Sequence, residues 1–260
     1  MKHILLSASF FLLTASGFAA DSENHFKILN QDIAKVVTSP ARFDSGDWIT
    51  VGAVAVGFGA LYAADGEIRD MFQRNRGNTT NSIENVFKSF GRIETAVPAF
   101  ALIYGGAKIF DNKKLARASA MSLESFIIAG LIFEAVKFAT HRDRPYENTS
   151  PYVWHGPGLY DRNQSFPSGD AATAFALLTP IAHVYGDTPL VAPLAYTCAA
   201  LAGLGRMNHN DHWASDVFIG SALGYFTAKA VIKYREADSP VTLLPILGAD
   251  TKGLVVVSRF

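Results

Sequence analysis

One short stretch of the sequence combines a histidine, an aspartate and an arginine at spacings suited to catalysis. His212 precedes Asp216 by four residues at the start of an apolar run, so on a helix both side chains would lie on one face. There the carboxylate can hold one ring nitrogen and leave the other free as a nucleophile or base. Arg206, six residues before His212, adds a cation whose planar donors suit phosphate. Taken alone, such a His/Asp pair is also typical of a surface or capping pair.

A second motif upstream carries two more cations. Lys137 is followed seven residues later by Arg144, and Pro145 marks the end of a helix because it disfavours helical geometry in the residue before it. Lys137 would therefore lie in the last turns of this helix and Arg144 at its exit, where both could point into one pocket. Basic residues near a helix carboxyl end are also explained by the helix dipole alone.

A third motif begins another helix. Ser168 is placed to cap the apolar run that starts at Ala171, and Gly169 would let a ligand approach the backbone closely. A helix amino terminus with free amides and a hydroxyl binds anions readily. The alternative is an ordinary helix start with an acidic residue, Asp170, in its first turn.

Together, the three motifs supply what phosphoryl transfer through a phosphohistidine requires. The cations and amides would stabilise charge on the equatorial oxygens, the histidine would attack in line, and water would then release phosphate. The sequence has no Walker-type glycine loop, no HExxH motif and no cysteine pair, so the common nucleotide and metal templates are absent. We expect no metal and no other cofactor.

The motifs resemble the three-part signature of the type 2 phosphatidic acid phosphatase and vanadium haloperoxidase superfamily. Order and internal spacing match in Lys137-x6-Arg144-Pro145, Pro167-Ser168-Gly169 and Arg206-x5-His212-x3-Asp216. The resemblance implies an all-helical bundle with His212 as the nucleophile and Asp216 as the residue that orients it. It also implies a phosphate site formed by Lys137, Arg144, Ser168, Gly169 and Arg206.

Two positions depart from the family's pattern. Gly205 stands where the family often has Ser, and Asp170 stands where it usually has a His that protonates the leaving group. Asp170 could be the acid if burial or a neighbouring carboxylate favoured its protonated form, but the nearby cations and helix start should favour the ionised form. We therefore expect an enzyme that works best at acidic pH or on good leaving groups. His141 and His209 are alternative acids.

The elements that must position these residues are helices. Apolar segments, each long enough for several helical turns, alternate with polar connectors at 48–64, 96–111, 118–140, 171–186, 189–205 and 213–232. A capping signal at Asn81 predicts a short amphipathic helix before the second of them. Two apolar runs around a Gly/Asp turn predict a hairpin at the carboxyl end. We expect an all-α fold, a helical bundle of about six core helices, with a small C-terminal β-hairpin.

The sequence suggests four parts. Lys2, an apolar run and small residues at Gly17 and Ala19 predict a secretory signal peptide, with an uncleaved anchor as the alternative. A polar arm, the helical domain and the hairpin follow. The boundaries are 1–20 for the signal peptide, 21–47 for the amino-terminal arm, 48–236 for the helical phosphatase domain and 237–260 for the hairpin.

The connector between the second and third motifs is long for a compact domain and rich in aromatic residues. Residues 146–165 carry Tyr152, Trp154, His155 and Tyr160 among Gly and Pro. Loops of this length are usually functional or disordered. We expect a lid over the substrate pocket, or alternatively aromatic packing onto the bundle.

Composition limits the partners and the environment. Hydrophobic residues make up 49% of the 260-residue chain and charged residues 18%, which is richer in apolar side chains than an ordinary soluble domain. The net charge of +0 predicts no nucleic-acid partner. The apolar segments are interrupted by glycines or carry charges, and a basic connector at 111–118 would fall outside the cell in a spanning topology. We favour an exported soluble or peripherally attached domain, with a membrane-spanning bundle as the alternative.

These observations predict an exported, metal-independent phosphatase. Its partner would be a lipid phosphate or a small phosphorylated molecule, either a phosphate monoester or a diphosphate, and it would be periplasmic or otherwise exported and associated with a membrane or soluble. Two alternatives stay open. One is a vanadate-dependent haloperoxidase using the same anion site, and the other is a phosphate-binding or membrane-structural homologue with weak turnover. Neither the substrate nor the oligomeric state follows from the sequence.

Overall fold

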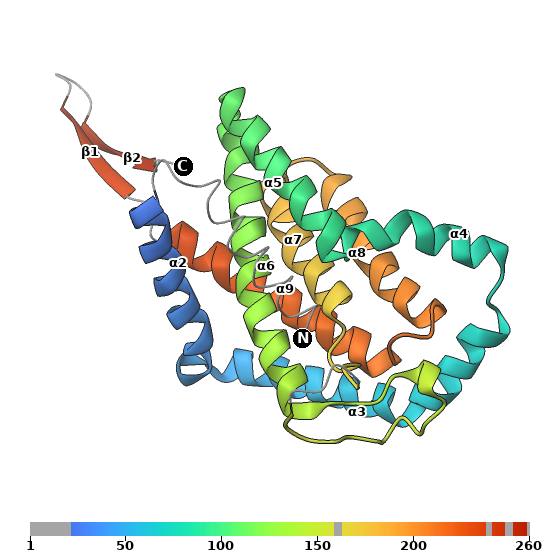
Figure 1. Cartoon of the computed structure of the whole chain (residues 1–260). Helices are drawn as coiled ribbons and strands as arrows, with labels where there is room; N and C mark the ends of the chain where they lie inside the picture. The colour runs from blue at the N-terminus through green and yellow to red at the C-terminus, as the bar shows by residue number, and fades with distance from the viewer. Residues whose placement is uncertain (1–21, 159–162, 238–240, 248–251, 259–260) are drawn as a thin grey trace.

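The helices form a single bundle (Figure 1). The computed structural model describes residues 22–158, 163–237, 241–247 and 252–258, and side chains within 29–158 and 163–237. The α-helices of these residues are α2 (Ser22–Val37), α3 (Ser45–Arg74), α4 (Asn78–Phe87), α5 (Ile93–Ile109), α6 (Lys113–Thr140), α7 (Gly169–Val184), α8 (Val191–Asn208) and α9 (Ala214–Ala237). Six of them coincide with the apolar segments of the sequence, so the all-α class is confirmed.

Helix α7 lies at the centre, packed between α6, α8 and α9. Its inward positions are mostly small, which lets the neighbouring helices approach closely. A Cβ added at Gly220 of α9 would lie 2.3 Å from the carbonyl oxygen of Ser168, and one added at Gly224 would lie 2.2 Å from that of Ala172. These contacts bring the amino-terminal turn of α9 against the start of α7.

The region expected to be an amino-terminal arm contributes to the bundle. Val36 of α2 is buried in one apolar cluster with Met121, Ile128 and Val231 of α6 and α9, and Leu29 and Ile33 pack against it. The positions of Leu29, Ile33 and Val36 in the sequence place them on one helix face. Part of the region expected to be a polar arm is therefore a helix packed on the bundle, and its narrow apolar stripe was not recognised in the sequence because polar residues surround it.

Helix α4 begins earlier than its sequence signal suggested. Its N-cap is Gly77, whose amide donates to the hydroxyl of Thr80 at 2.9 Å. Short 3-10 helices are η1 (Ser39–Arg42), η2 (Lys88–Phe90) and η3 (Pro145–Glu147). The difference of a few residues at the start of α4 is typical, because sequence signals mark helix boundaries only approximately.

Helix α3 differs from the others in its exposure. Both α3 and α6 are long and apolar enough to cross a membrane, but only 6% of the apolar window of α3 is buried, against 61% for α6. Figure 1 shows α3 running across one end of the bundle, where it contacts α9 and α8. Its exposed apolar side chains include Trp48, Ile49, Val51 and Val56.

Two strands follow α9. β1 (Val241–Leu247) and β2 (Lys252–Ser258) pair antiparallel, with Val241 opposite Ser258. The side chains of this expected hairpin, and the whole signal peptide expected at 1–20, lie outside the described residues. The fold class rests on the helices alone.

Candidate active site

The three motifs meet at one end of the bundle. The carboxyl ends of α6 and α8 and the amino ends of α7 and α9 each place a site residue there. The amide of Ser168 donates to the carbonyl oxygen of Asp216 at 3.0 Å, and Arg206 pairs with Asp170 at 2.9 Å. Ser168 caps α7 as expected, with its hydroxyl accepting from the amide of Ala171. The sequence-predicted residues thus converge although 79 positions separate Lys137 from Asp216.

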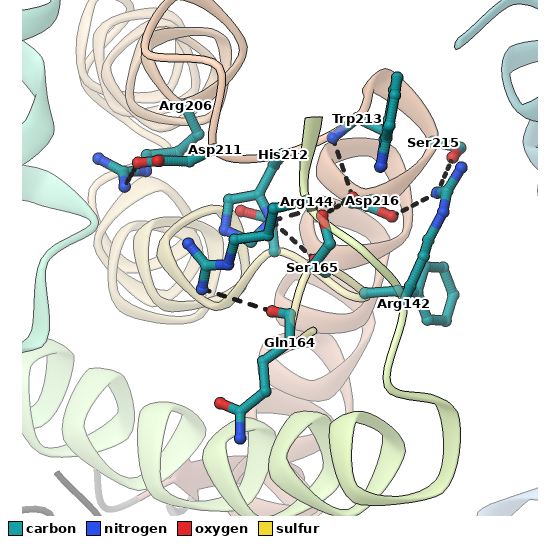
Figure 2. A network of polar contacts seen from close by, with 12 residues as sticks. Arg142, Arg144, Gln164, Ser165, Arg206, Asp211, His212, Trp213, Ser215 and Asp216 are labelled. Carbon is teal, nitrogen blue, oxygen red and sulfur yellow. Dashed lines mark hydrogen bonds and ion pairs between the residues drawn. The ribbon is translucent and has the colours of Figure 1, made fainter. Parts of the chain in front are cut away.

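His212 is held by a backbone carbonyl. It is 6% exposed, and its Nδ1 lies 2.7 Å from the carbonyl oxygen of Ser165 (Figure 2). A carbonyl oxygen only accepts, so the proton of the neutral imidazole must be on Nδ1. Nε2 then carries a free lone pair, and it has no hydrogen-bond partner among the described residues. This is the tautomer a nucleophilic histidine needs.

Asp216 supports His212 indirectly. Its Oδ2 lies 3.9 Å from Nδ1 of His212, too far for the direct hydrogen bond that the four-residue spacing suggested. Oδ2 instead accepts from the Ser165 hydroxyl at 2.5 Å and from the Trp213 amide at 2.9 Å. Asp216 therefore positions Ser165, and the carbonyl of Ser165 positions His212.

Burial lowers the pKa of His212 well below its usual value, and the positive charges of Arg144, Arg206 and Lys137 lower it further. The hydrogen bond to Ser165 opposes the shift. The three cations come from α6, from the segment after it and from α8, and each lies near enough to the imidazole for its charge to act on it. Their charge keeps the imidazole neutral and would stabilise a bound phosphate.

Gly169 lies beside the ammonium group of Lys137. A Cβ added at Gly169 would lie 3.2 Å from Nζ of Lys137 and 3.4 Å from the ring of Phe133. Nζ also lies 5.0 Å from the centre of that ring and 3.4 Å from Glu134. The missing side chain of Gly169 thus leaves room for the lysine at the start of α7, as the anion site requires.

Arg206 holds two carboxylates. Its Nε lies 2.9 Å from Oδ2 of Asp170, and its Nη2 pairs with Asp211. Despite the short ion pair with Asp170, Nε makes no hydrogen bond of acceptable geometry, and Nη1 is buried without a hydrogen-bond partner among the described residues, so Nη1 stays available for an anion. Asp170, which stands where the family has a histidine, is therefore in the site and 25% exposed, but it contacts a cation.

The alternative acids are engaged elsewhere. His141 is 1% exposed, and its Nδ1 lies 3.0 Å from the carbonyl oxygen of Gly156. His209 pairs with Glu84 at 3.1 Å. Each of these histidines thus has one ring nitrogen engaged with another part of the protein, whereas Asp170 is paired with Arg206 of the site.

The aromatic connector packs onto the bundle in its described part. Trp154 donates from Nε1 to the Tyr62 hydroxyl at 2.9 Å, and the ring of Tyr152 lies against that of Tyr62. His155 pairs with Asp143 at 2.7 Å. Tyr152 and Trp154 thus pack onto α3, as the packing alternative expects. The end of the connector contacts the site through Gln164 and Ser165, and Tyr160 lies outside the described residues.

Several residues of the site were not identified from the sequence. One of them is Arg142, whose side chain is 0% exposed and bonds to Asp216, Ser215 and Asp65. Arg142 lies inside the second motif, between Lys137 and Arg144, so its position was a usable signal. Asp65 and Ser165 lie outside all three motifs and carry no such signal.

Residues 119–239 match the model of the PAP2 superfamily, a span that contains all three motifs. These residues are a PAP2 domain. Among curated proteins, the chain is 46% identical over 61 residues to the lipid A 1-phosphatase of Porphyromonas gingivalis, covering 23% of this chain and 14% of that protein. It is 29% identical over 143 residues to lipid phosphate phosphatase 1 of Arabidopsis thaliana, covering 44% and 42%. The chain thus spans less than half the length of either relative.

Two solved structures share the fold of the PAP2 domain. One is the transmembrane PAP2 type phosphatidylglycerolphosphate phosphatase of Bacillus subtilis, with a TM-score of 0.56, 20% identity and coverage of 72% of this chain and 96% of that one. The other is Aquifex aeolicus LpxE, with a TM-score of 0.50, 22% identity and coverage of 65% and 95%. Among the residues the structure describes, no three His, Cys, Asp or Glu side chains gather as a metal site.

Proposed function

We propose that the protein is a phosphoric ester hydrolase that removes phosphate from a lipid phosphate through a phosphohistidine at His212. The observation that carries the proposal is the state of this imidazole. Its Nδ1 proton is held by the carbonyl of Ser165, its Nε2 is free, and three cations lower its pKa. A buried neutral imidazole surrounded by cations suits attack on a bound phosphate dianion.

The proposed reaction has two steps. Nε2 attacks phosphorus while the bond from phosphorus to the leaving oxygen breaks, and the leaving oxygen takes a proton from Asp170. Water then attacks the phosphohistidine, gives its proton to the carboxylate of Asp170, and releases inorganic phosphate with His212 restored. Lys137, Arg144, Arg206 and the amides at the start of α7 would neutralise the phosphate oxygens. No metal is needed for this sequence of steps.

The weak step is protonation of the leaving group. The carboxylate of Asp170 is engaged in an ion pair with Arg206, so it is not free to act on a leaving oxygen without giving up that contact. We therefore propose a preference for acidic pH or for leaving groups that depart without a proton, such as the phosphate of a diphosphate or an activated phenol. Among lipid substrates, a phosphate monoester, whose alkoxide must take a proton as it leaves, should be hydrolysed more slowly than a diphosphate.

A lipid substrate is supported by the surface of α3. This helix exposes an apolar stretch long enough to cross a membrane, at the same end of the bundle as the site. The curated relatives carry lipid phosphatase names. The apolar run at residues 4–13 supports export. We accordingly propose an exported, membrane-associated enzyme in preference to a soluble acid phosphatase.

The test uses the purified full chain in detergent and in mixed vesicles, with chelator present. Hydrolysis of a lipid phosphate, a lipid diphosphate and an activated aryl phosphate is compared for the wild type, His212→Ala, Asp170→Asn and Asp170→His. We expect His212→Ala to abolish turnover and radiolabelled phosphate to be trapped on the wild-type histidine. Asp170→His should raise hydrolysis of the lipid phosphate, whereas Asp170→Asn should retain activity on the aryl phosphate and the lipid diphosphate, whose leaving groups need no proton.

The same preparation separates the alternatives. Bromide oxidation that requires added vanadate would assign the site to a haloperoxidase. Phosphate binding without hydrolysis, identical in the wild type and His212→Ala, would assign it to a binding protein and refute the enzyme.

A further inference from the structure

Arg142 is a buried cation that cannot reach a substrate. Its side chain is 0% exposed, and every N–H of its guanidinium has an acceptor. Nε and Nη2 donate to the carbonyl oxygen of Pro151 at 2.9 and 2.7 Å, and Nη2 also donates to Oδ2 of Asp65 at 2.7 Å. Nη1 donates to Oδ1 of Asp216 at 2.6 Å and to the Ser215 hydroxyl at 2.7 Å. Every hydrogen bond of Arg142 therefore goes to another group of the protein, and no donor is left for a substrate.

Aromatic rings surround the same guanidinium. Its central carbon lies 4.9 Å from the ring centre of Tyr62, 5.0 Å from that of Trp154 and 5.5 Å from that of Trp213. These rings come from α3, from the connector and from the start of α9. They exclude water and strengthen the ion pairs of Arg142, and they make its position depend on the docking of α3.

A continuous chain of contacts leads from Arg142 to the nucleophile. Asp216 accepts from Arg142 through Oδ1 and from the Ser165 hydroxyl through Oδ2. The carbonyl of Ser165 holds Nδ1 of His212 (Figure 2). Each link fixes the next, so a shift of Arg142 would move the imidazole or change the tautomer that its Nδ1 proton defines.

The end of this series of contacts that lies farthest from His212 is on α3. Asp65 is 0% exposed and is the one fully buried residue of that helix. Besides Arg142, it accepts from the Ser215 amide at 2.9 Å and from the Ser215 hydroxyl at 2.5 Å, in the first turn of α9. A buried carboxylate at a helix amino terminus complements the helix dipole and caps a free amide. Asp65 thus links the exposed helix α3 to Arg142, which precedes His212 in the sequence, and to Ser215, which follows it.

We propose that Asp65 and Arg142 are positioning residues for the nucleophile, and that α3 completes a catalytic unit which residues 119–239 alone do not form. This inference rests on the phosphohistidine function proposed above. Asp65 lies 54 residues before the start of the matched PAP2 span. The carboxylate of α3 holds Arg142 on the side opposite Asp216 and also accepts from the amide and hydroxyl of Ser215. Without it, Arg142 loses a buried acceptor and can shift relative to Asp216, which weakens the support of Ser165.

The principal variant is Asp65→Asn, which keeps the shape of the side chain and removes its charge. Its matched control is Glu67→Gln, which removes the same charge from an exposed position on the same helix. Full-length protein is compared by thermal unfolding, by kcat and KM on an activated aryl phosphate, and by inhibition with inorganic vanadate. We expect kcat of Asp65→Asn to fall by roughly tenfold to a hundredfold, because small misplacements of a reacting group cost about this much. KM and vanadate inhibition should stay within about twofold, because the anion site itself is untouched.

The pH dependence of kcat/KM distinguishes a positioning role from a general loss of structure. His212 faces the cations Lys137, Arg144 and Arg206 and the carboxylate of Asp216, while Asp170 and Asp211 lie on Arg206. Removing the negative charge of Asp65 should move the acid limb of kcat/KM to lower pH. Removing the positive charge with Arg142→Gln should move it to higher pH. A merely structural role predicts lower activity at every pH without these opposite shifts.

A further readout does not depend on activity. Nitrogen NMR of histidine-labelled protein, with the His212 signals assigned from His212→Ala, reports which ring nitrogen carries the proton. The wild type should show the proton on Nδ1, and Asp65→Asn should show a mixture of tautomers. Ser215→Ala keeps both charges and covers the case in which Asp65→Asn does not fold; it should lower kcat several-fold with unchanged vanadate inhibition.

The outcomes distinguish this inference from the proposed function. A wild type that hydrolyses no phosphate ester refutes the function, and NMR still decides whether Asp65 holds the tautomer. An active wild type with kcat and tautomer unchanged in folded Asp65→Asn or Ser215→Ala refutes the positioning role alone. Equal losses in Asp65→Asn and Glu67→Gln would also refute it.

Discussion

Replacing Gly169 by alanine tests the geometry of the phosphate site with the smallest available change. The substitution keeps the backbone amide that would face an anion and adds one methyl group. That methyl would lie 3.2 Å from Nζ of Lys137, where ordinary contacts are 3.4–4 Å. The ammonium is the end of a flexible side chain, so it should move by about 0.5 Å, and the fold should not be strained.

The size of the effect follows from Coulomb's law. Moving a unit charge from about 3.0 to about 3.5 Å from a phosphate oxygen, at an effective dielectric constant of about 20, weakens the attraction by about 0.8 kcal/mol. That corresponds to a loss of about fourfold in kcat/KM. Thermal stability should be equal or slightly higher, because alanine favours a helix over glycine by about 1 kcal/mol.

The assay measures kcat/KM on an activated aryl phosphate beside thermal unfolding. The control is Gly130→Ala on α6, where the added methyl would meet only the Phe133 ring at 3.9 Å. We expect the control to keep full activity. Unchanged kcat/KM in Gly169→Ala, or an equal loss in both variants, would show that the position of Lys137 beside Gly169 does not matter for phosphate.

Three further predictions concern His212 and its support. The nucleophile must be neutral, and its lowered pKa keeps it neutral as pH falls, so the acid limb of the kcat/KM profile should lie well below the usual histidine value of about 6.5. Arg144→Gln removes the cation with the largest effect on this pKa and should move the acid limb to higher pH; a pH series in which the limb does not move would contradict this. Gly220→Ala would place a methyl group 2.3 Å from the Ser168 carbonyl oxygen and should lower the free energy of unfolding by about 1–3 kcal/mol, as measured with denaturant. A variant as stable as the wild type would show that α9 can move away from α7. Ser165→Ala keeps the carbonyl that holds His212 and loses only the hydroxyl, so kcat should fall less than in His212→Ala; steady-state kinetics showing complete loss would place the hydroxyl in the chemistry itself.

The helices were predictable because their signals are local. An apolar run longer than a strand, a serine cap before α7 and a proline after Arg144 each lie within a few residues of the boundary they mark. The amphipathic α2 was missed because its stripe is short and its surroundings polar. Only the tertiary structure shows that Val36 of this helix is buried against residues of α6 and α9.

The partner of His212 shows where spacing misleads. Four residues on a helix predict a His/Asp contact, but His212 lies before α9 begins at Ala214, so the helical spacing does not apply. The oxygens of Asp216 are already occupied by Arg142, Ser165 and the Trp213 amide. A backbone carbonyl has no sequence signature, so its role could not be predicted.

The sequence by itself indicated the helical class, the PAP2 resemblance that residues 119–239 confirm, and the cations, cap and histidine of the proposed site. These features depend on residue type and short spacing, which a linear chain already contains. Only the tertiary structure decided that Asp65, 77 positions before Arg142, neutralises a charge behind the nucleophile. Burial creates that requirement, because a guanidinium removed from water must find its acceptors wherever the fold brings them.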